Sequence, residues 1–127
     1  MSRIRVVQWS TGNVGRQALA AILDHPDLVL VGLFAFGRDK VGQDAGVLCG
    51  RDPVGVRATN DVDALIALAP DCLVYTPAYG DDETVVRFLE AGINVVTTSG
   101  YISVPNGPRG PDFYAKIEAA ARRGHAS

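Results

Sequence analysis

The stretch VVQWSTGNVG, residues 6–15, decides how this chain is expected to fold. It completes an apolar run, Ile4–Trp9, and leads into a segment whose apolar residues recur at helical spacing. The dinucleotide-binding fingerprint G-x-G-x-x-G has the same context, because it follows a strand and opens a helix. Gly12 and Gly15 occupy the second and third glycine positions of that pattern, and Ser10 occupies the first. The stretch therefore predicts a strand–turn–helix unit in which serine replaces one glycine.

Strand-like and helix-like segments alternate along the remaining chain. Residues 28–36 form a near-continuous apolar run, which is typical of a strand covered on both faces in a parallel sheet. We predict further strands at 54–58, 72–75 and 93–97, helices at 13–23, 61–68, 82–91 and 112–123, and loops over most of 37–53 and 99–111. This order predicts an α/β fold of the Rossmann type, with a doubly wound, mostly parallel sheet and helices on both faces.

Apolar spacing and end signals indicate how the helices are oriented. Asp61 has the side chain of an N-cap residue, and Gly92 suits the position just after a helix end. In the helix at 82–91, the residues predicted to face inward are Val85, Phe88 and Leu89. In the first helix, the predicted buried face consists of Val14, Ala18, Ala21 and Ile22.

Length and composition exclude several classes of protein. With 127 residues, 47% of them hydrophobic, the chain is expected to form one domain with a packed core. The formal net charge of −2 gives no electrostatic footprint for nucleic acid, and no apolar run approaches the roughly 20 residues of a membrane span. Cys49 and Cys72 lie far apart, which favours reduced thiols in a cytoplasmic protein. His25 and His125 have no ligand-like neighbours, so no metal site is predicted.

Elementary physics favours a ligand at the turn between the first strand and the first helix. A helix N-terminus presents free N–H groups and a partial positive charge, so it binds phosphate. Glycine at position 12 lets the backbone approach a pyrophosphate, and glycine at position 15 lets the helix pack closely on the sheet. The residues predicted to bind the pyrophosphate are Ser10, Thr11, Gly12, Asn13, Val14 and Gly15. The alternative is a tight turn that binds no ligand.

Charged residues after the second strand bear on the choice between NAD and NADP. NAD sites place Asp or Glu at the end of this strand, and the run at 28–36 ends without an acid. Arg38 and Lys40 follow at once, and two positive charges suit the 2′-phosphate of NADP. NADP is therefore favoured over NAD, although Asp39 between them can accept a hydrogen bond from a 2′-hydroxyl group. The alternative is that these are solvated loop charges.

Loops with hydroxyl side chains follow the fourth and fifth predicted strands. The carboxyl ends of parallel strands border one crevice, so these loops should lie near the glycine-containing turn. Small hydroxyl and backbone groups there can hold the nicotinamide ribose and carboxamide. The residues predicted for this role are Thr76, Pro77, Thr98, Ser99 and Gly100.

Four segments together resemble the N-terminal domain of the dihydrodipicolinate reductase-like oxidoreductases, especially the branch of 2,4-diaminopentanoate dehydrogenase and related amine dehydrogenases. WSTGNVG at 9–15 takes the place of the family's G-x-x-G-x-x-G loop, and VGQDAG at 41–46 resembles its D-A-G segment. TP at 76–77 resembles the loop after the fourth strand, and TTSGY at 97–101 resembles a T-T-G-[FY] turn with one added residue. The resemblance implies an NAD(P)-dependent enzyme acting at a carbon–nitrogen centre. It also implies that Arg38 lies near the adenosine ribose and 97–101 near the nicotinamide.

Two departures limit what this resemblance implies. Trp9 stands where the family has the first glycine of its loop. The family's substrate domain, which carries the acid–base residues, is expected downstream of residues 1–127, which we assign to the dinucleotide-binding domain. No catalytic residue is therefore assigned, and a small-molecule substrate is expected to bind through the missing C-terminal domain. An open sheet edge, where the next strand would pair, makes formation of a homo-oligomer a further expectation.

Two classes of function remain open from the sequence. In the first, the chain is the cofactor half of an NAD(P)H-dependent oxidoreductase that transfers hydride at a C=N or C–N carbon and is inactive alone. In the second, it is a non-catalytic nucleotide-binding or sensing module that shares the fold. A failure to bind NADPH or NADH would exclude the first class.

Overall fold

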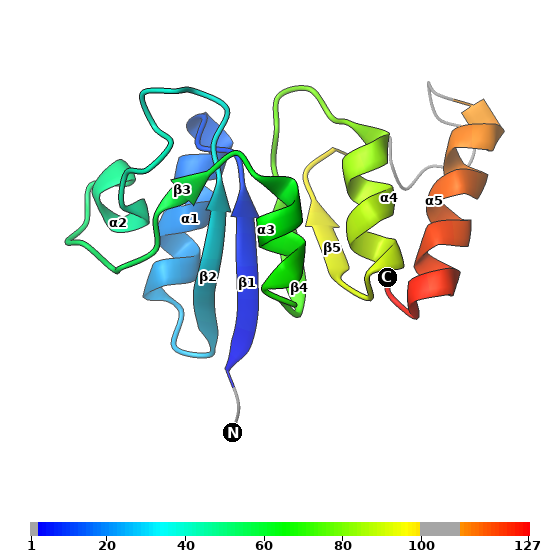
Figure 1. Cartoon of the computed structure of the whole chain (residues 1–127), viewed down its shortest axis with the longest axis horizontal. Helices are drawn as coiled ribbons and strands as arrows, with labels where there is room; N and C mark the ends of the chain where they lie inside the picture. The colour runs from blue at the N-terminus through cyan, green and yellow to red at the C-terminus, as the bar shows by residue number, and fades with distance from the viewer. Residues whose placement is uncertain (1–2, 100–109) are drawn as a thin grey trace.

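A computed structural model describes residues 3–99 and 110–127 of the chain, and its strands and helices alternate as predicted (Figure 1). The strands are β1 (Ile4–Trp9), β2 (Leu28–Phe34), β3 (Ala58–Thr59), β4 (Cys72–Tyr75) and β5 (Asn94–Thr97). The helices are α1 (Asn13–Asp24), α2 (Ala45–Leu48), α3 (Val62–Ala67), α4 (Asp82–Glu90) and α5 (Gly110–Gly124). The strands run parallel in the order β3-β2-β1-β4-β5, which confirms the predicted Rossmann-type fold.

Helices cover both faces of the sheet. Successive residues of a strand point to opposite faces, so two neighbouring residues of β1 show which helices lie on each face. Val6 of β1 belongs to a buried cluster with Leu19 of α1, and α2 contributes to the same cluster. Val7 belongs to a second cluster with Leu65 of α3 and Phe88 of α4, and α5 packs against it. The sheet is therefore doubly wound, with α1 and α2 on one face and α3, α4 and α5 on the other (Figure 1).

The buried face of α1 differs from the predicted one. Its buried residues are Gly15, Leu19 and Ile22. Of the predicted set, Ile22 is buried and Ala18 is partly buried, whereas Val14 and Ala21 are exposed. The reason is that Gly15 packs against the turn before the helix, which directs the residues four and seven positions later toward the sheet.

The segments around β2 and β3 also differ from the prediction. β2 ends at Phe34, and the chain then turns so that Phe36 is 63% exposed. β3 is shorter than the strand predicted at 54–58 and shares only Ala58 with it, because the N–H groups of Val54 and Gly55 donate to the Asp44 carboxylate instead of a strand. The segment predicted as mostly loop at 37–53 contains the short helix α2.

The predicted N-cap of α3, and the predicted end and buried face of α4, are confirmed. Asp61 caps α3 by accepting a hydrogen bond from the Ala64 N–H at 3.1 Å. Gly92 follows α4 with a φ of +83°. The predicted inward residues of α4, namely Val85, Phe88 and Leu89, are all buried.

The C-terminal helix begins slightly earlier than predicted, at Gly110, and packs along α4 (Figure 1). The predicted loop at 99–111 lies mostly outside the described residues. No helix within residues 3–99 and 110–127 is long and apolar enough to cross a bilayer.

Candidate cofactor site

The carboxyl ends of four neighbouring strands lie in register at one edge of the sheet. Trp9 pairs with Phe34 on one side and with Tyr75 on the other, and Tyr75 pairs with Thr97. The segments that follow β1, β2, β4 and β5 therefore leave the sheet at the same level. In open α/β sheets, ligands bind at this edge.

The turn between β1 and α1 has a glycine-like backbone although it begins with serine. Ser10 has a φ of +90°, a left-handed conformation that favours glycine. The Ser10 N–H donates to the Phe34 carbonyl at 3.0 Å. Gly12 is the N-cap of α1, and its carbonyl accepts a hydrogen bond from the Arg16 N–H at 2.8 Å. Because Gly12 has no side chain to cap the first turn, the helix N-terminus can present its N–H groups to an anion.

The two glycines of the turn have different surroundings. A Cβ atom on Gly12 would meet nothing within 4 Å, so the space over this residue is open. A Cβ atom on Gly15 would lie 2.4 Å from the Ser10 carbonyl oxygen and 3.3 Å from Thr76 Oγ1. Gly15 therefore permits the close approach of α1, and Gly12 is where a ligand can approach the backbone.

A buried polar network lies beneath the turn. Thr76, the first residue after β4, donates from Oγ1 to the Trp9 carbonyl at 3.1 Å. The same Oγ1 accepts a hydrogen bond from Gln8 Nε2 at 2.8 Å. Gln8 and Thr76 are both buried, at 0% and 7% exposure. The predicted ligand residue Thr76 thus joins the end of β4 to the end of β1.

Trp9 fills the sheet face opposite α1. Its ring stacks on Phe34, with 3.6 Å between centroids, and lies 5.7 Å from Tyr75 and 6.2 Å from Phe88. Since α1 covers the other face, the indole does not enter the turn. A tryptophan at this position is therefore compatible with the turn, and the left-handed residue is Ser10, one position later.

The charged residues after β2 border the turn. Lys40 Nζ donates to the Thr11 carbonyl at 3.3 Å, so this cation lies directly against the turn. Arg38 is exposed in the segment that follows β2. The Asp39 carboxylate folds back over Gly37, and its Oδ1 lies 2.5 Å from the position that a Cβ on Gly37 would take.

The remaining predicted residues are distributed along the same sheet edge. Asn13 and Val14 are exposed in the first turn of α1, and Pro77, which follows Thr76, is buried. After β5, Thr98 is exposed and the buried Ser99 donates from its N–H to Thr97 Oγ1 at 2.9 Å. Gly100 lies outside the described residues.

Residues 5–103 match the family model described as "Dihydrodipicolinate reductase, N-terminus". The chain belongs to this family. It is the N-terminal, NAD(P)-binding domain of a dihydrodipicolinate reductase-like protein, as the resemblance implied.

Relatives are found among both amine dehydrogenases and dihydrodipicolinate reductases. The chain is 37% identical to an amine dehydrogenase of Streptomyces virginiae over an alignment of 131 positions, which covers 98% of this chain and 36% of the relative. It is 35% identical to the 4-hydroxy-tetrahydrodipicolinate reductase of Burkholderia multivorans, over 75% of this chain and 36% of the relative. The structure of amine dehydrogenase from Mycobacterium smegmatis superposes with a TM-score of 0.86 at 28% identity, over 98% of this chain and 38% of that one. The chain therefore spans just over a third of the length of these relatives.

The D-A-G segment, residues 44–46, holds the connection between β2 and β3 through hydrogen bonds of its aspartate. The Asp44 carboxylate accepts hydrogen bonds from the N–H groups of Gly46 at 2.8 Å, Val54 at 3.0 Å and Gly55 at 2.8 Å. These bonds, that from Val54 foremost, hold the pKa of Asp44 below its ordinary value. A Cβ on Gly46 would lie 2.0 Å from the Asp52 carbonyl oxygen. The segment therefore fixes the long connection between β2 and β3.

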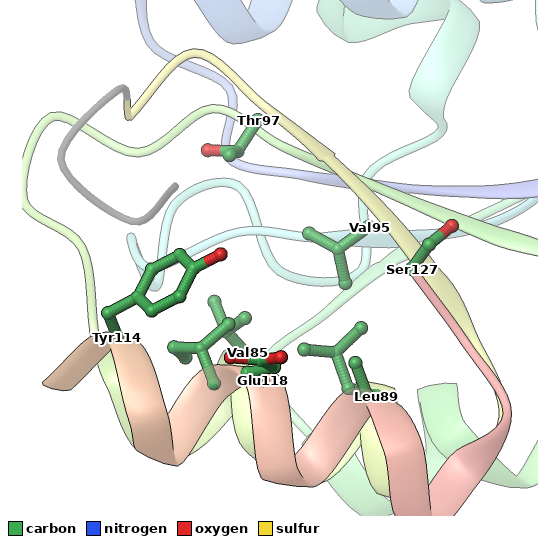
Figure 2. A pocket seen from close by; sticks show the side chains of 9 residues that line it. Val85, Leu89, Val95, Thr97, Tyr114, Glu118 and Ser127 are labelled. Carbon is green, nitrogen blue, oxygen red and sulfur yellow. The ribbon is translucent and has the colours of Figure 1, made fainter. Parts of the chain in front are cut away.

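A cleft of about 240 Å³ lies between β5, α4 and α5 (Figure 2). Val85 and Leu89 form its apolar floor, and Tyr114 and Glu118 of α5 stand beside them. Ser127 closes one end, where its carbonyl accepts a hydrogen bond from a β5 N–H at 2.8 Å. Within the described part of the chain, none of the β1–α1 turn lines this cleft, so we do not assign the cofactor to it.

Gln8 is the residue of the site that sequence reasoning missed. Its side chain contacts the backbone of the turn and Thr76, which is 68 residues away in the chain. The available signal was an uncharged polar residue near the end of the predicted strand Ile4–Trp9, just before a predicted ligand-binding turn.

Proposed function

We propose that this chain is the cofactor-binding domain of an NAD(P)-dependent oxidoreductase that transfers hydride at a carbon–nitrogen centre. The observation that carries the proposal is the β1–α1 turn, with Ser10 at a φ of +90°, open space over Gly12 and close packing at Gly15. The relatives named as amine dehydrogenases support a carbon–nitrogen centre as the place of reaction.

The residues present fit a nicotinamide dinucleotide. The open backbone at Gly12 and the uncapped start of α1 suit a pyrophosphate. Thr98 and Ser99, at the end of β5, would hold the nicotinamide end. When bound, the dinucleotide would supply hydride transfer, and this chain's residues would bind and orient it. The substrate and the acid–base groups would belong to a part of the protein beyond this domain.

We further propose that the site prefers NADP to NAD. Lys40 supports this preference, because its ammonium group already lies against the turn at the Thr11 carbonyl. A 2′-phosphate would give this cation a stronger acceptor than a backbone carbonyl. Arg38 would add a second, more exposed positive charge.

Direct binding tests the proposed function. The purified chain would be titrated with NADPH and NADH, with dihydronicotinamide fluorescence as the signal and coenzyme A as a second nucleotide. We expect binding of at least one dinucleotide and no substrate turnover. Failure of both dinucleotides to bind up to millimolar concentration would contradict the proposal, and binding of coenzyme A alone would favour a non-catalytic nucleotide-binding module.

Two alanine variants test the cofactor preference. Charge-assisted hydrogen bonds contribute about 1.5–3 kcal/mol. Lys40→Ala is therefore expected to raise the Kd for NADPH roughly tenfold more than the Kd for NADH. Arg38→Ala is expected to have a smaller effect in the same direction, because the side chain is exposed. Equal weakening of both cofactors by both variants would show that neither cation contacts a 2′-phosphate.

A further inference from the structure

A glutamine side chain is fully buried at the end of β1. Gln8 is 0% exposed, and burial of a primary amide is unfavourable unless its groups form hydrogen bonds. Its Nε2 lies 3.0 Å from the Trp9 carbonyl, 3.2 Å from the Ser10 carbonyl and 2.8 Å from Thr76 Oγ1. Among the described residues its Oε1 has no hydrogen-bond partner. All three hydrogen bonds of this amide are therefore donated by its Nε2 group, and two of the three acceptors are backbone carbonyls.

One of those carbonyls belongs to the strained residue of the turn. Ser10 has a φ of +90°, which is unfavourable for any residue with a Cβ atom. Such a conformation persists only when its surroundings hold it in place. The Ser10 N–H is held by the Phe34 carbonyl at 3.0 Å, and the Ser10 carbonyl is held by Gln8 Nε2. Within residues 3–99 and 110–127, the Gln8 amide is thus one of two polar contacts that keep the Ser10 backbone in this conformation.

The Ser10 carbonyl also sets the position of the first helical turn. A Cβ on Gly15 would lie 2.4 Å from its oxygen, so α1 packs directly against this peptide group. Thr76 Oγ1, the third acceptor of the Gln8 amide, lies next to the same glycine. A rotation of the Ser10 peptide would therefore displace the start of α1 and the N–H groups of the turn.

We infer that Gln8 is a positioning residue for dinucleotide binding. Its buried amide lets serine occupy a glycine position by holding the Ser10 carbonyl, and this contact sets the shape of the turn at residues 10–15. The inference rests on the proposed function, because it concerns the affinity of the turn for NADPH or NADH. Gln8 acts through the backbone of the turn and is not assigned a direct contact with the cofactor.

A double-mutant cycle between Gln8 and Ser10 tests the inference. Gln8→Met keeps the length of the side chain but removes its donors. We expect this substitution to raise the Kd for NADPH or NADH at least about tenfold in the wild-type background. With Ser10→Gly already present, the left-handed conformation no longer needs support, and Gln8→Met should raise the Kd less than about threefold. Gln8→Leu, which is also apolar and has no hydrogen-bond donor, is a second variant with the same expected pattern.

A control separates positioning from general loss of stability. Leu89→Ala removes buried apolar volume in the last turn of α4, at the end of this helix opposite the sheet edge that carries the turn, and is expected to lower the free energy of unfolding without changing the Kd. Urea unfolding of every variant would be measured beside its Kd. Unchanged affinity in both Gln8 variants, or an equal loss of affinity with and without Ser10→Gly, would overturn this inference and leave the proposed function standing. If the wild-type chain binds neither dinucleotide, the proposed function fails and this inference fails with it.

Discussion

Ser10 carries backbone strain that a glycine would not. A non-glycine residue in a sparsely populated backbone region costs about 1–3 kcal/mol. Ser10→Gly is therefore expected to raise the free energy of unfolding by about 1 kcal/mol, because part of the gain is offset by the greater freedom of glycine in the unfolded chain. Urea denaturation measures this change. Ser10→Ala is the matched control, since it keeps the Cβ atom and the strain, and an equal gain in that variant would contradict the argument.

The two glycines of the turn should respond in opposite ways to substitution. Gly12→Val points into open space, so the free energy of unfolding should change little, while the affinity for NADPH or NADH should fall at least a hundredfold. Gly15→Ala brings a methyl group to 2.4 Å from the Ser10 carbonyl oxygen and should destabilise the fold by about 3 kcal/mol. Thermal unfolding and a cofactor titration of each variant check both expectations. Unchanged affinity in Gly12→Val would place the ligand elsewhere.

Asp44 makes the stability of the long β2–β3 connection dependent on pH. Backbone N–H donors, that of Val54 first, lower the pKa of this carboxyl group from its ordinary value of 3.8. The carboxylate therefore stabilises the fold above about pH 3.8, and this contribution is lost as the pH falls through the lower folded-state pKa. Asp44→Asn should be less stable than the wild type at pH 7, with a smaller difference near pH 3. A difference that does not shrink on acidification, measured by urea unfolding, would contradict this account.

At the scale of elements, the sequence predicted what depends on local pattern. The bounds of β1 and β4 match the prediction, and the inward face of α4 was predicted because its apolar residues follow one helical stripe. The face of α1 was predicted wrongly, because glycine carries no apolar signal although the approach of Gly15 to the turn orients the helix. The third strand was predicted too early, at 54–58, because the Asp44 carboxylate binds the N–H groups of Val54 and Gly55 and keeps them out of the sheet.

The predicted site included Thr76 but not its hydrogen-bond partner Gln8. Thr76 was selected because loops at strand ends bind ligands, and this needs only the order of elements. Gln8 was not selected, because a glutamine in a strand is usually exposed and its partner Thr76 is distant in the sequence. A buried polar contact of this kind becomes visible only when the two strands are paired.

The contact between α4 and α5 depends on a glycine at its closest point. A Cβ on Gly124 would lie 1.8 Å from the Leu89 carbonyl oxygen and 3.0 Å from the Gly92 nitrogen. Gly124→Ala should therefore push the end of α5 away from α4 and lower the free energy of unfolding by about 2 kcal/mol or more. Chemical denaturation measures the loss. Gly12→Ala is the control, because its Cβ would meet nothing within 4 Å, and an equal loss there would contradict the packing argument.

At the scale of the whole molecule, the strand order brings distant segments to one ligand edge. Because β1 lies between β2 and β4, the glycine turn stands between the charged segment after β2 and the hydroxyl-bearing segment after β4. Trp9, the single tryptophan of the chain, is buried under this edge at 3% exposure. Its emission therefore reports on the packing of the core beneath this edge.

Cofactor binding should stabilise the entire domain by mass action. A ligand that binds only the folded chain, at a concentration of 100 times its Kd, adds about 2.7 kcal/mol to the free energy of unfolding. For a domain of this length, that gain corresponds to a rise in Tm of about 10 °C. Trp9 emission, followed during heating with and without NADPH, measures the shift, and Gly12→Val should abolish it while keeping the Tm of the free chain. A shift of equal size in that variant would mean that the stabilising contacts lie outside the β1–α1 turn.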